Sequence, residues 1–348
     1  MVPLLLNHIK GWALAAYIAM GFFLTLYCFN VFANFSLEEY SLPITDYFSY
    51  VILFCVFPML FFSALRSEED FDRLANIIIF SGFLLGVVSY FLYAEQITGG
   101  VTRISAISRD NDDASYLSPL ALSYSGSLTI IVSLMKLMST TSRTLQKVFY
   151  LSAAISGLYC FMLGASRGSV VSLFISFILL LVIYRARFRL STLIFLISIL
   201  VCVPTFLSIT GSGVFERVLN IRADVESGAS SSARVEIWRA AFDSIKENPF
   251  FGGRIEVFGN YPHNFLVEAF MVTGLVGGGL FLFSYLYFSA KSFKLAVSEK
   301  YILPFLILTH GSVEKFFSGS VKDSILIFIA LGMTCSALRL SREREACA

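Results

Sequence analysis

The sequence predicts an all-α fold, a polytopic transmembrane helix bundle of about ten spans with a long extracytoplasmic loop that contains an amphipathic helix. Hydrophobic residues make up 57% of the 348 residues, charged residues make up only 14%, and the mean hydropathy is +0.76. Soluble domains carry about 25% charged residues. Apolar runs near the length of roughly 20 residues that crosses a bilayer alternate with short polar links. This pattern favours a membrane protein over a soluble domain, and we expect no nucleic-acid partner.

The predicted spans follow from where each apolar run is interrupted. The first run, Trp12–Ala33, is long enough to cross a bilayer and precedes no small-residue cleavage site. It therefore predicts a retained helix and not a signal peptide. Charged or turn-forming links separate the later runs, and an even number of spans puts both termini on one side. In chain order, the predicted spans cover residues 12–33, 46–65, 74–95, 114–135, 147–163, 168–184, 190–208, 264–289, 299–313 and 323–338.

The positions of lysine and arginine predict the orientation. Of 26 such residues, 15 fall on the side that holds both termini and 11 on the other. Cytoplasmic loops are enriched in basic residues, so both termini are expected in the cytoplasm. Six of the 11 lie in the segment Gly211–Pro262, and long segments cross a membrane largely regardless of charge. We expect one membrane domain over 1–348, with residues 209–263 inserted as a periplasmic loop between spans seven and eight.

The long loop is predicted to contain an amphipathic helix over Ser232–Glu247. A serine run provides an N-cap, and Asn248-Pro249 ends the helix. Trp238 lies on its apolar face, and Arg239 lies on the opposite face. Because Asp243 follows Arg239 by four residues, a solvated ion pair that supports the helix is expected there. Such a helix either rests on the membrane surface or caps the bundle.

Arg234 departs from this amphipathic pattern, because it lies in the apolar sector one turn before Trp238. The predicted boundary places it in the first turn, where the helix dipole disfavours a cation. Free N–H groups at a helix start and a guanidinium together form a strong anion site. A side chain that reaches along the helix toward lipid headgroups is the other interpretation. We expect Arg234 to bind an anionic ligand.

The loop ends in Asn260-Tyr-Pro-His-Asn264 and leads directly into the eighth span. Because Pro262 is disfavoured inside a helix and Asn264 is a good N-cap, His263 is expected just before a helix start at the extracytoplasmic surface. A neutral imidazole there can accept a proton from a hydroxyl. Glu268 follows in the first turn, where it complements the helix dipole or orients another group. His310, at the end of the ninth span, is the second candidate base.

The segment Gly164-Ala-Ser-Arg-Gly168 formally matches the nucleophile motif of hydrolases. That motif requires a turn between a strand and a helix, whereas here it joins two apolar helices. An intramembrane serine protease with Ser166 and His263 as a dyad remains an alternative. Arg167 is the informative residue, since the topology places it on the same side as Arg234, although it could also simply end a helix at the interface. Its small neighbours allow close helix packing.

A further link on this side carries Arg103 and Arg109, balanced by three aspartates. A solvated link is one interpretation, and a basic contribution to the anion site from Arg103 is another. The acidic residues could attract a divalent cation, but their spacing is not that of a metal site. We therefore expect neither a metal nor a cofactor.

With these features together, the chain resembles the superfamily of O-antigen polymerases and O-antigen ligases, which are bacterial membrane glycosyltransferases. The resemblance covers roughly residues 100–270, and the flanks match only in topology. The features that carry it are the turn Ser166-Arg167-Gly168, Ser232-Ala-Arg-Val-Glu-Ile-Trp238, Asn248-Pro249-Phe-Phe-Gly252, Pro262-His-Asn264, Glu268 and Gly274-Leu-Val-Gly277. The family commonly has eleven or more spans, compared with the ten predicted here.

The resemblance implies transfer of a glycan from undecaprenyl diphosphate to an acceptor sugar hydroxyl on the periplasmic face. By matching position, it implies that His263 and Arg234 are catalytic and that Arg234, Arg167 and Arg103 bind the diphosphate. Asn264, Glu268 and Arg239 are expected to support them. We predict a metal-independent polymerase of polysaccharide repeat units in lipopolysaccharide biosynthesis. A ligase that passes glycan to lipid A–core, and a transporter of lipid-linked glycan, are alternatives.

The resemblance also implies location and partners. We expect a multi-pass protein of the bacterial inner membrane, with cytoplasmic termini and a periplasmic active site. Its partners would be the lipid bilayer and an undecaprenyl-diphosphate-linked oligosaccharide, with a chain-length regulator and a flippase as further candidates.

Overall fold

The computed structural model describes residues 11–34, 41–98, 118–138, 143–164, 166–184, 230–298 and 301–347. These residues are almost entirely helical and form no strand, which confirms the all-α prediction. Seven of the described helices are long and apolar enough to cross a membrane, and Arg167–Ile183 is a shorter apolar helix. The chain is therefore a multi-pass membrane protein. The predicted span 190–208 lies outside the described residues.

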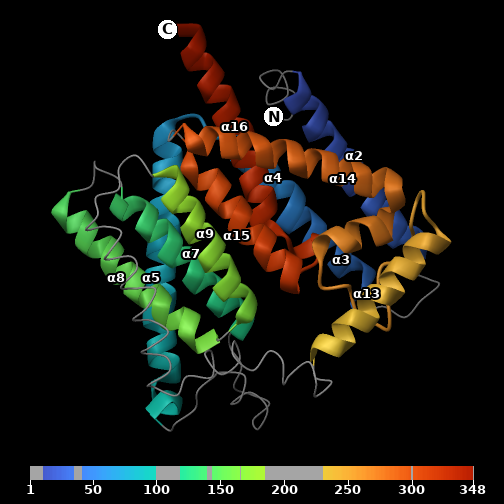
Figure 1. The fold of residues 1–348 in the computed structure, drawn as a ribbon, viewed down its shortest axis with the longest axis horizontal. Helices are drawn as coiled ribbons and strands as arrows, with labels where there is room; N and C mark the ends of the chain where they lie inside the picture. Colours follow the sequence, from blue (N-terminus) through green and yellow to red (C-terminus); the bar gives the residue numbers. More distant parts are fainter. Residues whose placement is uncertain are drawn as a thin grey trace. The chain divides into compact units, whose positions relative to one another are not determined.

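The described helices follow the predicted spans closely (Figure 1). The main differences are a second span that is divided by a π-helical segment, and helices at the third, eighth and tenth predicted spans that extend beyond their predicted limits. The helices are α2 (Trp12–Asn34), α3 (Ile44–Tyr50), η1 (Val51–Val56), α4 (Phe57–Phe62), α5 (Glu68–Thr98), α7 (Pro119–Met138), α8 (Thr144–Gly164), α9 (Arg167–Ile183), α13 (Ser230–Glu247), α14 (Phe265–Val297), α15 (Ile302–Ser318), η3 (Val321–Asp323) and α16 (Ile325–Cys347).

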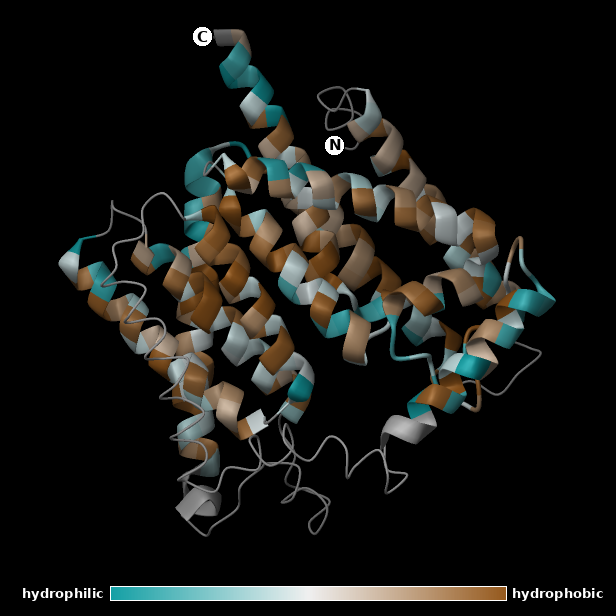
Figure 2. Cartoon of the chain, in the orientation of Figure 1, coloured by the Kyte–Doolittle hydropathy of each residue, from teal (hydrophilic) through white to brown (hydrophobic). Residues whose placement is uncertain are grey.

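Backbone contacts group the chain into two compact units. The first unit combines Met1–Phe71 with Val225–Ala348, and the second unit covers Asp72–Asp224. In the first unit, α2 packs along α14, and α15 packs against α16 (Figure 1). Figure 2 shows that most of α2 and α14 is hydrophobic, whereas the C-terminal end of α16 is hydrophilic. Exposed apolar side chains on α2, such as Phe22 and Phe32, fit a surface that faces lipid.

In the second unit, α7 and α8 approach closely because glycines face each other. A Cβ atom at Gly126 would lie 2.4 Å from the carbonyl oxygen of Gly157. Small residues at such crossings let membrane helices pack backbone to backbone. At one end of α7, the hydroxyl of Ser123 lies 2.6 Å from that of Ser169 and donates to the carbonyl oxygen of Phe161 at 3.1 Å. The start of α9 is thereby held against α7 and α8.

Helix α14 is broken at Gly274, and the loop that precedes the helix fills the break. Gly274 has φ 63° and ψ −163°, a conformation that glycine adopts without a Cβ penalty. The N–H of Leu275 donates to the carbonyl oxygen of Pro249 at 2.7 Å, and the N–H of Val276 donates to that of Phe250 at 3.1 Å. Backbone groups inside a bilayer need such partners, so the loop completes the helix.

The same break is tied to α2 by one side chain. The amide of Asn30 donates to the carbonyl oxygens of Val272, at 2.6 Å, and Phe251, at 2.8 Å. A Cβ atom at Gly274 would lie 2.4 Å from backbone atoms of Phe250, so no other residue fits without displacing the loop. The position of this loop, and of the segment 254–264 that follows it, therefore depends on the break in α14.

Candidate active site

Helix α13 packs onto the first part of α14 in the first unit (Figure 1). Ala241 lies in a cluster with Val257 and Met271, and all three are buried. Trp238 lies on the same face, and its indole N–H donates to the carbonyl oxygen of Pro262 at 2.7 Å. This bond connects α13 directly to the residue before His263.

Arg234 points from α13 to the end of α15. Its guanidinium donates to the carbonyl oxygen of Phe317 at 3.0 Å, in the last turn of α15, where the helix dipole favours a cation. Because α13 begins at Ser230, two residues before the predicted start, Arg234 follows the first turn instead of lying within it. The predicted position in the first turn is therefore wrong, and the negative end of a neighbouring helix explains why the cation is tolerated.

His263 lies just before α14, and its backbone is in the left-handed region with φ 54°. Asn264 is the N-cap of α14, as predicted, and its side-chain oxygen accepts from the N–H groups of Leu266 and Val267 at 3.0 and 3.1 Å. The imidazole is partly buried and lies against the ring of Tyr261, with 4.3 Å between the ring centroids. The cap and the ring contact orient the side chain of His263.

The electrostatic environment keeps His263 neutral. Burial lowers the pKa of His263 most, and the positive charge of Arg234 lowers it further. Asp323 raises the pKa of His263, and the ammonium of Lys322 lowers it again, so the net change is downward. These interactions show that Arg234 and His263 lie near each other at one end of the first unit. A neutral imidazole beside cations can accept a proton.

Glu268 is wholly buried in the first turn of α14, with 1% of its surface exposed. Its carboxylate accepts from the hydroxyls of Tyr27 and Ser320, both at 2.7 Å, and from the N–H of Val321 at 3.2 Å. Of the two predicted roles, the structure therefore favours orientation of other groups, since Glu268 anchors the link between α15 and α16 to α2 and α14.

That link carries Lys322, which was not among the predicted site residues. Its ammonium lies 4.3 Å from the ring centroid of Tyr47 and 4.9 Å from that of Tyr261. Lys315, by contrast, forms ion pairs with Glu314 at 3.0 Å and Asp323 at 3.2 Å. The available signal was the position of both lysines on the predicted side that is poor in basic residues.

The remaining predicted residues have different outcomes. Arg239 is exposed, and Asp243 pairs with Lys246 at 2.7 Å, so the predicted pair between Arg239 and Asp243 is absent from the described residues. The i,i+3 spacing brings Lys246 within reach of the same carboxylate. Arg167 is the first residue of α9 in the second unit and is partly buried. Arg103 lies outside the described residues.

His310 and Ser166 do not gain support as catalytic groups. Helix α15 continues to Ser318, so His310 lies in the helix interior with no exposed surface instead of at the end of a span. A base must reach its substrate, and His310 does not. Ser166 is the buried N-cap residue of α9 and follows a helix, not a strand. This context is not that of a nucleophile elbow.

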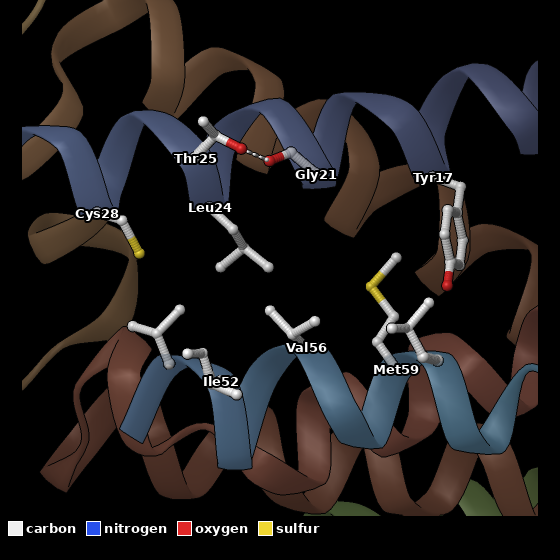
Figure 3. A pocket seen from close by; sticks show the side chains of 10 residues that line it. Tyr17, Gly21, Leu24, Thr25, Cys28, Ile52, Val56 and Met59 are labelled. Carbon is white, nitrogen blue, oxygen red and sulfur yellow. Dashed lines mark hydrogen bonds between the residues drawn. The ribbon is translucent and has the colours of Figure 1, made fainter. Parts of the chain in front are cut away.

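An apolar cavity of about 430 Å³ lies in the first unit between α2 and the η1–α4 segment (Figure 3). Figure 3 shows Leu24, Val56 and Met59 directed into it, with Thr25 bonded to the carbonyl oxygen of Gly21 at its wall. The helix η1 also contacts the link that carries Lys322, because the thiol of Cys55 donates to the carbonyl oxygen of Val321 at 3.3 Å.

Comparison with known families identifies one region of the chain. Residues 151–282 match the family model described as O-Antigen ligase, a stretch that includes Arg167, Arg234, His263 and Glu268. A comparison with curated proteins gives no match. Members of the matched family are membrane glycosyltransferase-like enzymes. The match over residues 151–282 supports the resemblance of this multi-pass membrane protein to the superfamily of O-antigen polymerases and O-antigen ligases.

Proposed function

We propose that this protein transfers an oligosaccharide from undecaprenyl diphosphate to a sugar hydroxyl at the periplasmic face of the inner membrane, and so polymerises repeat units. The proposal is supported by the position of α13, whose Trp238 bonds to Pro262 and which brings the charge of Arg234 close enough to lower the pKa of His263, inside the region that matches the O-antigen ligase family. A cation for the leaving diphosphate and a base for the acceptor are the two groups that this transfer requires.

In the proposed reaction, the acceptor oxygen forms a bond to the anomeric carbon while the bond from that carbon to the diphosphate oxygen breaks. The electron pair of the breaking bond stays with the diphosphate, and the Arg234 guanidinium stabilises the charge. The hydroxyl proton passes to an imidazole nitrogen of His263, which later releases it to water. One in-line displacement of this kind inverts the anomeric centre.

Arg167 and Arg103 are proposed as further diphosphate-binding groups, on the strength of the resemblance alone. Arg167 is the first residue of α9, and hydrogen bonds that join Ser166 and Ser169 to the Ser123 hydroxyl fix the start of that helix. The backbone of Arg167 therefore has a defined position within the second unit. No metal takes part in the proposal, since arginine supplies the charge that a metal ion would otherwise contribute.

The decisive experiment is reconstitution of the full-length protein in nanodiscs with a defined undecaprenyl-diphosphate-linked repeat unit. A polymerase converts this donor alone into a ladder of longer lipid-linked glycans, whereas a pure ligase requires lipid A–core as acceptor. Chain lengthening without lipid A–core supports the polymerase. Product that forms only on lipid A–core replaces it with the ligase, and no product in either reaction contradicts the glycosyltransferase proposal.

Three variants separate the proposal from other classes of protein. A transporter of lipid-linked glycan would move its cargo with Arg234→Ala and His263→Ala largely tolerated, and charged residues of transporters lie within the bilayer. A serine protease would lose its activity with Ser166→Ala, whereas we expect glycan transfer to persist in that variant. Loss of transfer in Ser166→Ala, with the fold intact, would favour a nucleophilic role for this serine.

A further inference from the structure

Lys322 is a buried cation without a carboxylate partner among the described residues. Only 5% of its surface is exposed, and its ammonium lies over the rings of Tyr47 and Tyr261. Within the part of the chain that the structure describes, this ammonium neither forms an ion pair nor donates a hydrogen bond. Its contacts are therefore with aromatic faces, which attract a cation but carry no net charge.

The buried carboxylates around Lys322 already have other partners. Glu268 accepts from Tyr27, Ser320 and Val321. Glu256 accepts from the N–H and hydroxyl of Ser41 and from the hydroxyl of Tyr47, the same tyrosine whose ring lies under the Lys322 ammonium. Glu268 and Lys322 interact electrostatically, but no described carboxylate forms an ion pair with Lys322, and burying a cation that is only partly neutralised is unfavourable. Lys322 is thus held where an incoming anion would lower the free energy of the site.

This cation lies beside the proposed catalytic base. The ring of Tyr261 contacts both groups. The Lys322 ammonium lies 4.9 Å from the centroid of this ring, and the centroid of the His263 imidazole lies 4.3 Å from it. The link that carries Lys322 directly follows α15, whose last turn accepts the hydrogen bond from Arg234. Two basic groups, a guanidinium from α13 and an ammonium from η3, therefore both act on His263.

We propose that Lys322 binds the diphosphate of the lipid-linked donor together with Arg234. The proposal rests on the glycan transfer proposed above. A diphosphate presents several charged oxygens, so a planar guanidinium and a compact ammonium can each take different ones. The rings of Tyr47 and Tyr261 hold the ammonium in place before the donor arrives. Because no carboxylate forms an ion pair with this ammonium among the described residues, its N–H groups can donate to the diphosphate.

The test uses the full-length protein in nanodiscs and inorganic diphosphate as the probe, with binding measured by titration calorimetry. Lys322→Met keeps the length and apolar character of the side chain but removes the charge. We expect its affinity for diphosphate to fall by about tenfold or more, the loss of one hydrogen bond to a charged group. Lys322→Arg should retain most of the affinity. Lys246→Met, on the exposed face of α13, is the control and should bind like the unchanged protein.

Thermal unfolding separates a binding role from a structural one. If Lys322 serves the ligand, Lys322→Met has an unfolding temperature equal to or above that of the unchanged protein, but loses the rise that diphosphate produces. A lower unfolding temperature with an unchanged diphosphate response assigns Lys322 to the structure alone and overturns the proposal. Should Lys322→Met fail to fold, Lys322→Gln and Lys322→Arg provide the same comparison of neutral and charged side chains.

The outcomes also distinguish this proposal from the one on which it rests. If glycan transfer occurs and depends on Arg234 while Lys322→Met binds diphosphate normally, the role of Lys322 is wrong and the function stands. If diphosphate binding depends on Lys322 but no lipid-linked donor is consumed, the anion site stands and the function is wrong. Failure of the unchanged protein to bind diphosphate contradicts the anion site itself.

Discussion

Two buried lysines, seven residues apart, lie in contrasting environments. Lys315 is neutralised by Glu314 and Asp323, whereas the ammonium of Lys322 lies over two aromatic rings and forms no ion pair with any described residue. Similarly, Glu268 accepts three hydrogen bonds, while Arg234 has one carbonyl partner within the part of the chain that the structure describes. Charges with complete partners maintain the fold, and charges with incomplete partners are available to a ligand. Both kinds of charge lie near the start of α14, on α13, α14, α15 and η3.

The largest effect should come from the incompletely partnered groups. We expect Arg234→Ala and His263→Ala each to reduce glycan transfer by about 100-fold or more, because each removes a group that acts in the transition state. Both proteins should still insert and elute as the unchanged protein does. The measurement is product formation from lipid-linked donor in nanodiscs, with Lys246→Ala as the control on the exposed face of α13.

Arg234→Lys sharpens this test. A lysine retains the charge but not the planar fork that binds two oxygens at once, so its transfer rate should remain far below that of the unchanged protein. Full activity of Arg234→Lys would show that a simple positive charge is enough.

The fully partnered lysine should affect stability more than catalysis. Lys315→Met leaves Glu314 and Asp323 without their cation, and we expect a loss of about 1–3 kcal/mol, below the value for a fully buried pair because Asp323 is 38% exposed. Unfolding monitored by circular dichroism measures this loss. Transfer per folded molecule should fall much less than in Arg234→Ala. Equal losses of transfer in both variants would remove the distinction between the two kinds of charge.

The pH dependence should reveal how the flanking charges act on His263. Burial and Arg234 lower the pKa of His263, so the base stays neutral and active as pH falls below its ordinary value of about 6.5. Activity should decrease only when pH passes through the lowered pKa of His263. In Lys322→Met this acid limb should move to higher pH, and in Asp323→Asn to lower pH. Acid limbs that coincide in all three proteins would argue against His263 as the base.

The smallest effect is expected from metal removal. Since arginine and lysine supply the charge at the proposed donor site, treatment with a chelator should leave the transfer rate unchanged. The assay is the same product ladder after treatment with EDTA. A loss that added Mg²⁺ restores would show that the basic groups are not sufficient.

Much of the fold could be predicted from length, composition and periodicity. The apolar runs are long enough that their identity as spans is clear, and Asn264 was recognisable as an N-cap from its position after Pro262. The predictions failed where a single helix was considered alone. The predicted start of α13, Ser232, was two residues late. The predicted partner of Asp243 was Arg239, whereas Asp243 pairs with Lys246 in the structure. Both features, the first residue of a helix and the partner of Asp243, depend on which of several neighbouring groups forms the better contact, and residue spacing alone does not decide this.

The sequence by itself determined that the chain is helical and crosses a membrane, and it placed Arg234 and His263 in the long segment that precedes α14. Only the tertiary structure decided the partners: the break at Gly274 that seats the loop, the anchoring of Glu268, and the placement of Lys322 beside Tyr261. The reason is physical. Hydrophobic length and helix caps act within about 20 residues along the chain, whereas neutralisation of a buried charge depends on groups that only folding brings together.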